Sequence, residues 1–445
     1  MRAARPFLRR AASILAAAAL ALALLLALSA ARGGPSAPLT PRDRMEVFEK
    51  SWKEINDHYY DPQFHGVNWA AVHDKYVPIV GTVADDEQFY VVMGRMTAEL
   101  HDAHTRFSSP QQWQNHEKQQ GYATGVRIAA VEGQLAVTEV LPESSAARAG
   151  IEPGMIVTWV NGKPVQEKIA EAEKEVTPSS SERFTRLRVL ATVFGGPPEA
   201  PLVLGLQRAD GSQFEARLAR QMISTAPHVT ASHPYSDIAV VRFDQFRPWV
   251  AKELKQELEK DHGARGIVID LRRNGGGEGS ALEAMAGYFF PRKTLLAKIM
   301  RRKQIEKAER DGGGERQSDM YAGKDGGQIY AGSVVVLISE SSGSAAELFA
   351  AGLQDEGRAK IVGSQSCGCV LGITKSRAMK GGGVLEISEV LWFSPKGRKL
   401  EGEGVMPDET VAPTISSLRE KRDPVLDEGV KLVRDLAVRE PSAAR

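Results

Sequence analysis

The sequence predicts an α/β protein with an added β-rich part and a helical N-terminal part. Mostly apolar runs of strand length occur at 238–243, 266–271 and 333–338, interrupted by the charged residues Arg242 and Asp270. Helical patterns follow these runs at 249–260, 280–290 and 345–353. Strands that alternate with helices indicate a mostly parallel sheet, and such apolar runs indicate strands buried on both faces. Between 116 and 220 short strands and turn signals prevail instead, which indicates a separate β-rich unit.

Composition and charge exclude some classes of function. The chain has 445 residues, of which 42% are hydrophobic and 25% are charged. These values are ordinary for a globular protein, and the length allows about two to four domains. The formal net charge is +1. Because nucleic-acid binding needs a basic field, we expect no nucleic-acid partner.

Residues 1–31 have the pattern of an export signal. The first ten positions hold four arginines and no acidic residue, and 11–31 is almost entirely Ala and Leu. This pattern is typical of a secretory signal, and the apolar stretch is also just long enough to span a bilayer. The sequence therefore leaves two interpretations open, a cleaved signal peptide and a retained membrane anchor. In either case we expect the rest in the periplasm, soluble or anchored to the inner membrane.

The remaining chain divides into five parts. A linker rich in Gly, Pro, Ser and Ala ends the export region, and a C-terminal helix and tail close the chain. Within the core, the charged, Gly-rich stretch at 301–328 is predicted to be a mobile loop, and 384–393 a strand. The predicted parts are the linker at 32–43, the helical segment at 44–115, the β-rich unit at 116–220, the core at 221–420 and the C-terminal part at 421–445.

The β-rich unit resembles a PDZ domain. The resemblance lies in GVRI at 125–128 and in VTEVLPESSAARAGIEPGMIVTWVNGKPV at 137–165, which contains the hairpin signal Asn161-Gly162. It implies a domain that adds an extended peptide to a sheet edge, with backbone amides near Gly125 and Val126 holding a C-terminal carboxylate. A regulatory or structural domain that blocks an active-site cleft is the alternative.

Two segments that follow predicted buried strands have residues suited to chemistry. GSAAE at 343–347 begins a helix, where backbone N–H groups and the helix dipole stabilise a developing anion. DLRRNGGG at 270–277 places three glycines in a turn, so that backbone N–H groups can approach a ligand closely. The serines could equally be helix caps, and the glycines a flexible turn.

Together these segments resemble the carboxyl-terminal processing peptidases, or tail-specific proteases. The resemblance covers about residues 44 to 415 and includes motifs in the same order and spacing. It implies a crotonase-like (ClpP-like) peptidase core and an exported serine endopeptidase that recognises substrate C-termini through the PDZ domain. It also implies Ser344 as nucleophile, with the N–H groups of Ala345 and Gly276 as the oxyanion hole. The further motifs are YYDP at 59–62, DAHTRF at 102–107, LQDEGRAKIVG at 353–363, FSPKGR at 393–398 and GVMPD at 404–408.

One position departs from the family. The general base is usually a Lys twenty-five residues after the Ser, and this chain has Cys369 there. A branch that resembles tricorn and a chlamydial secreted protease uses Ser–His–Glu instead, which here suggests His104 as base and Glu403 as the residue that orients it. Glu401 lies two residues before Glu403.

Three alternatives to that triad stay open. Lys375 could act as a relocated base, although it would need an irregular strand to reach the site. Cys369 could act itself, which would require a lowered pKa. The chain could also be a catalytically inactive protein that binds peptides.

The two cysteines and the histidines give no further site. A bridge between Cys367 and Cys369 would close a very small, strained ring, so two buried thiols are expected. His101 and His104 have no third ligand at suitable spacing, so neither a metal nor a cofactor is expected. The expected partners are protein or peptide substrates, while homo-oligomers, an adaptor and membrane attachment stay open.

Overall fold

The computed structural model describes residues 38–311, 318–327 and 330–439. The predicted export signal at 1–31 lies outside these residues. Within the described ranges, no helix is both long and apolar enough to cross a membrane.

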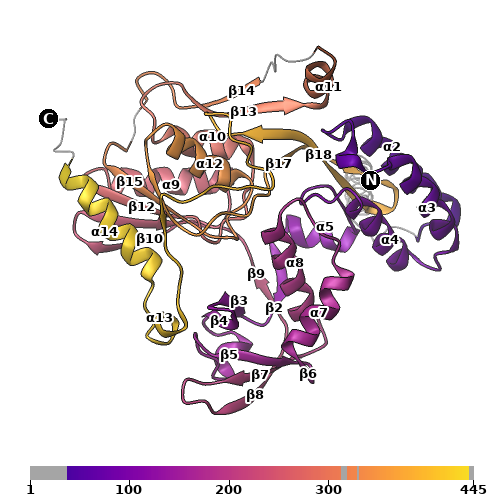
Figure 1. The fold of residues 1–445 in the computed structure, drawn as a ribbon, viewed down its shortest axis with the longest axis horizontal. Coiled ribbons are helices and arrows are strands. Elements are labelled where there is room, and N and C mark those ends of the chain that lie inside the picture. The colour runs from indigo at the N-terminus through magenta and orange to yellow at the C-terminus, as the bar shows by residue number, and fades with distance from the viewer. Residues whose placement is uncertain (1–37, 312–317, 328–329, 440–445) are drawn as a thin grey trace, which may run out of the picture.

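A six-stranded sheet lies at the centre of the protein (Figure 1). β10 is antiparallel to β11, and the other neighbours are parallel. Parallel neighbours need crossover connections, which α9 (Pro248–Lys260) and α12 (Ala345–Asp355) supply. The strand order is β10 (Thr230–Tyr235), β11 (Ile238–Arg242), β12 (Gly266–Asp270), β15 (Ser333–Ile338), β16 (Lys360–Gly363) and β19 (Glu409–Thr410).

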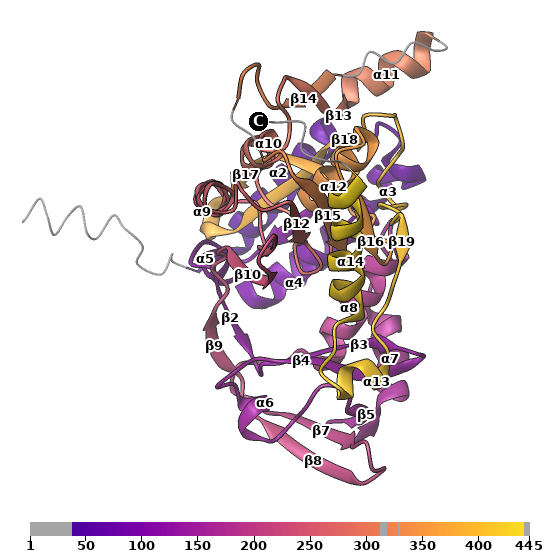
Figure 2. The same ribbon diagram turned by 90° about the vertical axis from the view of Figure 1, so that its left-hand side faces the viewer.

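Helices cover both faces of this sheet. Successive side chains of a strand point to opposite faces, so Val241 packs toward α9, α10 (Gly279–Gly287) and α12, while Val240 packs toward α14 (Pro424–Arg439). Figure 2 shows α14 lying along the sheet. Burial on both faces explains why the strands are mostly apolar runs.

A second, antiparallel sheet packs against the N-terminal helices. β17 pairs with β18 and has register shifts after Gly372 and Ile373. Phe48 and Phe89 of the helices pack with Leu385 and Ile387 of β18. The sheet order is β1 (Arg106–Ser108), β18 (Val384–Phe393), β13 (Thr294–Arg301) and β14 (Ser318–Ala322), with β17 (Leu371–Ala378) beside β18. The helices are α2 (Pro41–His58), the 3-10 turn η1 (Phe64–Gly66), α3 (Trp69–Thr82) and α4 (Asp86–Ala98).

The β-rich unit joins the rest through a two-stranded ribbon of β2 (Gln120–Ala123) and β9 (Gln221–Ser224). α5 (Pro110–Glu117) precedes the ribbon, and α13 (Ile415–Arg419) packs against the unit through Ile415 and Leu418. The sheet order is β3 (Val126–Val131), β4 (Gln134–Val140), β5 (Ile156–Val160), β7 (Leu202–Gln207) and β8 (Gln213–Leu218), with β6 (Lys163–Pro164) beside β5. Its helices are α6 (Ser145–Arg148), α7 (Val165–Glu175) and α8 (Glu182–Phe194).

The predicted hairpin is confirmed, and the predicted loop at 301–328 is wrong. Asn161 and Gly162 both have positive φ, as a tight two-residue hairpin turn requires, and β5 pairs with β6 across them. The stretch 301–328 instead contains α11 (Arg302–Asp311) and β14. No residue of α11 is buried, so no apolar periodicity marks this helix in the sequence.

Candidate active site

A cavity of about 590 Å³ lies between the central sheet's helices and the second sheet. Ser344, His104, Gly276, Ala345 and Lys375 all line it. The structure therefore brings together the predicted nucleophile, base and oxyanion donors, and also the alternative base. Glu403 does not line this cavity.

Ser344 is the residue that precedes α12, and its backbone conformation is unusual. Its φ is 53° and its ψ is −119°, a region that residues with a side chain rarely adopt. Its N–H donates to Cys369 O and to Glu347 Oε2, both at 3.0 Å. The peptide that carries this N–H is thus held from two sides.

The glycine turn packs directly against Ser344. Gly276 has a φ of +109°, and a methyl group built on it would lie 2.6 Å from Ser344 Cβ and 3.1 Å from Ala345 N. Both facts require glycine at this position. Among the described residues, the Ala345 N–H has no hydrogen-bond partner. The Gly276 N–H, in contrast, donates to Asn274 Oδ1 at 2.9 Å, so it is occupied in this structure.

His104 lies just before β1 and is held by Asp102. Asp102 Oδ1 accepts the N–H groups of His104 at 2.7 Å and of Thr105 at 2.6 Å. In the described part of the chain, His104 Nδ1 is buried without a hydrogen-bond partner. Burial lowers the pKa of His104 to about 4, although the negative charges of Asp102 and Glu386 raise it. The imidazole is therefore neutral near pH 7, as a general base must be.

The structure corrects the prediction for the orienting carboxylate. Glu403 is exposed, and its carbonyl oxygen accepts from Arg183 and Gln365. Glu401 is buried, but its carboxylate accepts from Val370 N at 2.6 Å and from Ser180 Oγ. Neither glutamate bonds to His104. Neither glutamate lines the cavity, which sequence spacing alone does not reveal.

Glu386 is a carboxylate of the cavity wall that the sequence analysis missed. It is 6% exposed, pairs with Arg106 at 2.7 Å and accepts from Ser376 Oγ at 3.0 Å. It faces Arg106 across the β1–β18 register, and His104 lies two residues before Arg106. Side chains alternate between the two faces of a strand, so the sequence could have suggested that Glu386 lies near Arg106 and His104 once the strand register was known.

Lys375 reaches the cavity because β17 is irregular. The register shift after Gly372 leaves an extra residue in β18, and the shift after Ile373 leaves an extra residue in β17 next to Lys375, which is the irregularity that the alternative required. Its side chain is exposed, so its ammonium group remains in water.

The prediction of two free thiols is wrong, because Cys367 and Cys369 form a disulfide. Their segment turns at Gly368, which has a φ of +72° and brings the two side chains to the same side. Glu347 and the two sulfurs lie close together, and the described residues contain no other group of metal-ligating side chains. With the thiols bridged, this group has no thiolate ligands to offer a metal.

The predicted peptide-binding residues, Gly125 and Val126, lie at the start of β3 and do not line this cavity. The Gly125 carbonyl accepts the Leu141 N–H at 2.8 Å, and Val126 pairs with Val140. β3 ends its sheet, so one of its edges is unpaired in the described structure. An unpaired edge is what peptide addition requires.

Comparisons with known proteins agree on one family. Residues 237–411 match the model described as peptidase family S41, and residues 40–98 match the Tricorn protease C1 domain. A carboxyl-terminal-processing protease of Synechocystis is 27% identical over 418 residues, which are 91% of this chain and 90% of that protein. A probable CtpA-like serine protease of Staphylococcus aureus (strain MRSA252) is 27% identical over 389 residues, which are 85% and 67% of the two chains.

Solved structures show the same fold. Mature CPAF has a TM-score of 0.65 at 15% identity, with 91% of this chain and 99% of that one covered. The photosystem II D1 C-terminal processing protease has a TM-score of 0.53 at 23% identity, with 90% and 98% covered.

Proposed function

We propose that Ser344 is the nucleophile of this serine peptidase, whose residues 237–411 match the model of peptidase family S41. The observation that carries the proposal is the position of Ser344. It lies in a strained backbone conformation between the glycine turn and the free Ala345 N–H, in one cavity with His104. The match of the family model favours this function over a peptide-binding protein without catalysis.

In the proposed reaction, Ser344 Oγ attacks the carbonyl carbon of the scissile peptide bond. Nδ1 of His104 is buried, so Nε2 is the nitrogen that takes the hydroxyl proton. The same nitrogen then gives the proton to the leaving amine. Water attacks the acyl-enzyme in the second half, again with His104 as base.

Charge stabilisation comes from two directions. The Ala345 N–H is the first donor to the oxyanion. The Gly276 N–H becomes the second donor when it gives up its hydrogen bond to Asn274 Oδ1 and donates to the oxyanion instead. Glu386 takes the place of Glu403 as the carboxylate that stabilises the imidazolium. Its ion pair with Arg106 holds it in the cavity wall.

The substrate proposed is a protein that presents a free C-terminus. The unpaired edge of β3 beside Gly125 and Val126 supports recognition of an extended peptide by a PDZ-type domain. We also propose that the chain acts outside the cytoplasm, because residues 1–31 have the composition of an export signal.

The experiment compares two serine substitutions in the full chain. Ser344→Ala abolishes hydrolysis of a fluorogenic peptide, whereas Ser341→Ala, an exposed serine of the same turn, keeps activity near wild type. Hydrolysis that survives Ser344→Ala would reject Ser344 as nucleophile. In the same assay, amidating the peptide's C-terminus raises KM, and an unchanged KM would reject recognition of the carboxylate.

A further inference from the structure

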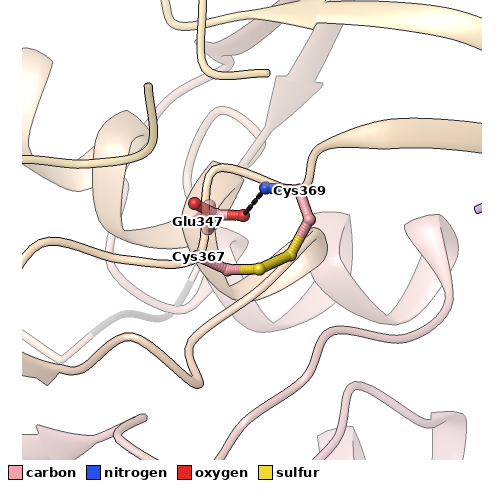
Figure 3. Close-up of side chains that lie close together, drawn as sticks. All are labelled: Glu347, Cys367 and Cys369. Atoms are coloured by element: carbon pink, nitrogen blue, oxygen red, sulfur yellow. Dashed lines mark hydrogen bonds between the residues drawn. A yellow bond between two sulfur atoms is a disulfide. The ribbon is translucent and has the colours of Figure 1, made fainter. Parts of the chain in front are cut away.

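The disulfide lies directly behind the nucleophile. Cys367 and Cys369 belong to the loop that joins β16 to β17, and Figure 3 shows the bridge beside Glu347 of α12. A methyl group built on Gly343, the residue before Ser344, would lie 3.1 Å from Cys369 Sγ. The bridge therefore packs on the turn that carries the nucleophile.

Hydrogen bonds connect the same loop to the peptide of Ser344. The Ser344 N–H donates to Cys369 O at 3.0 Å. Glu347, which accepts the Ser344 N–H through Oε2, also accepts the N–H groups of Cys369 at 3.1 Å and Gly368 at 2.7 Å. Both acceptors of the Ser344 N–H are thus bonded to the bridged segment or belong to it.

The bridge has a local effect rather than a global one. A disulfide stabilises a protein mainly by restricting the unfolded chain, and this restriction is smallest when the closed loop is short. Here one residue separates the cysteines, and that residue is a glycine with positive φ. Glycine has the most conformational freedom to regain when a constraint is removed. The bridge therefore holds the shape of the segment 367–369 and, with it, the position of Ser344.

We propose that the Cys367–Cys369 disulfide positions Ser344 for attack and that its reduction by a dithiol reversibly lowers peptidase activity. This proposal rests on Ser344 as nucleophile. When the bridge opens, Gly368 and Cys369 gain freedom, and the hydrogen bonds from Ser344 and to Glu347 loosen. Substrate binding elsewhere in the cavity is unaffected, so the effect falls on kcat and leaves KM unchanged.

The redox step balances with a dithiol reductant. One thiolate of the reductant attacks a sulfur of the bridge, and the other cysteine leaves as a thiolate. The second thiol of the reductant then displaces the first cysteine and forms the reductant's own disulfide. Two electrons and two protons pass to the protein, which ends as two thiols. The residues Cys367 and Cys369 are 2% and 6% exposed, so a small reductant is the suitable probe.

The test uses the full chain, purified without reductant and then treated with dithiothreitol under native conditions. Alkylation and mass spectrometry count the thiols, and a peptide assay gives kcat and KM. We expect both cysteines to be alkylated, kcat to fall about tenfold or more as for other misplaced catalytic groups, KM to stay within about twofold, and oxidised glutathione to restore kcat. The matched control is the double variant Cys367→Ser/Cys369→Ser, whose low kcat does not respond to dithiothreitol.

Three outcomes overturn the proposal: no thiols under native conditions, both thiols with unchanged kcat, or an equal response of the double variant. The wild-type cycle of reduction and reoxidation decides the matter even where the double variant fails to fold. Activity that survives Ser344→Ala rejects the proposed nucleophile instead. The two failures are therefore distinguishable.

Discussion

Ser344 is held in a backbone conformation that costs free energy, and Gly276 in one that only glycine adopts without strain. A residue with a side chain at positive φ costs on the order of 1 kcal/mol or more, and such positions gather where function requires them. Ser344 has a φ of 53° although it begins a helix. Gly276 faces it with a φ of +109° and leaves no room for a side chain. The pair opens a space beside the Ala345 N–H, which is the geometry that acyl transfer needs.

The identity of the base is testable at the residue scale. His104→Ala lowers kcat/KM by about a hundredfold or more, the usual contribution of a general base. Lys375→Ala, which changes another residue of the same cavity, lowers it by less than about threefold, because this exposed side chain takes no part in the proposed proton transfer. Because burial lowers the pKa of His104 to about 4, its imidazole is already neutral between pH 6 and 8, and the activity of wild type does not require its deprotonation in this range.

Steady-state kinetics of the two variants at pH 7.5 checks this prediction. A large loss in Lys375→Ala with little loss in His104→Ala would transfer the role of base to Lys375.

At the scale of elements, α12 is buried on all sides. Its first nine residues are buried, and most are small, because the helix lies between the central sheet and β13. A methyl group on Gly352 would come within 2.4 Å of Leu296. Glu347 is the one charged side chain among these nine residues, and it accepts from Ser344, Ser366, Gly368 and Cys369. It ties the start of the helix to the disulfide loop.

This carboxyl predicts an unusual dependence of stability on pH. Burial raises the pKa of Glu347 from 4.5 to about 7, although its hydrogen bonds lower it. A raised carboxyl pKa means that the folded state binds the proton more tightly. Its contribution to stability is therefore largest below about pH 4.5, falls as pH rises to about 7 and is absent above.

Urea unfolding at pH 5 and pH 8 measures this contribution. The drop in unfolding free energy between the two pH values is about 2 kcal/mol larger in wild type than in Glu347→Gln. Glu401, whose pKa burial also raises to about 7, titrates in both proteins and largely cancels. An equal drop in both proteins, or a larger one in the variant, would contradict the raised pKa.

At the scale of the whole molecule, the β-rich unit is bonded to both sides of the active site. The Ser180 N–H donates to His101 O at 2.6 Å, three residues before His104. The Ser181 hydroxyl donates to Cys367 O, and Arg183 Nε donates to Ser366 O at 2.6 Å. One short segment at the start of α8 thus bonds to residues near the base and near the disulfide.

The sequence predicts what depends on local pattern. The buried strand at 333–338 and the strand at 384–393 are found with the predicted bounds, because apolar period and turn residues determine them. What it could not predict depends on register and close packing. Glu386 lines the cavity beside Arg106, its partner in the β1–β18 register. Lys375 lines it next to the register shifts between β17 and β18. The disulfide forms across the turn at Gly368. None of these leaves a periodic signal along the chain.

Covalent labelling with a fluorophosphonate tests the central claim most directly, because such a probe reacts with an activated serine. Peptide mapping by mass spectrometry of the labelled full chain should place the adduct on Ser344. We expect His104→Ala to slow labelling about a hundredfold, as loss of a general base does, and Ser341→Ala to leave the rate unchanged. Labelling of another serine, or labelling of Ser344 at the same rate without His104, would contradict the account.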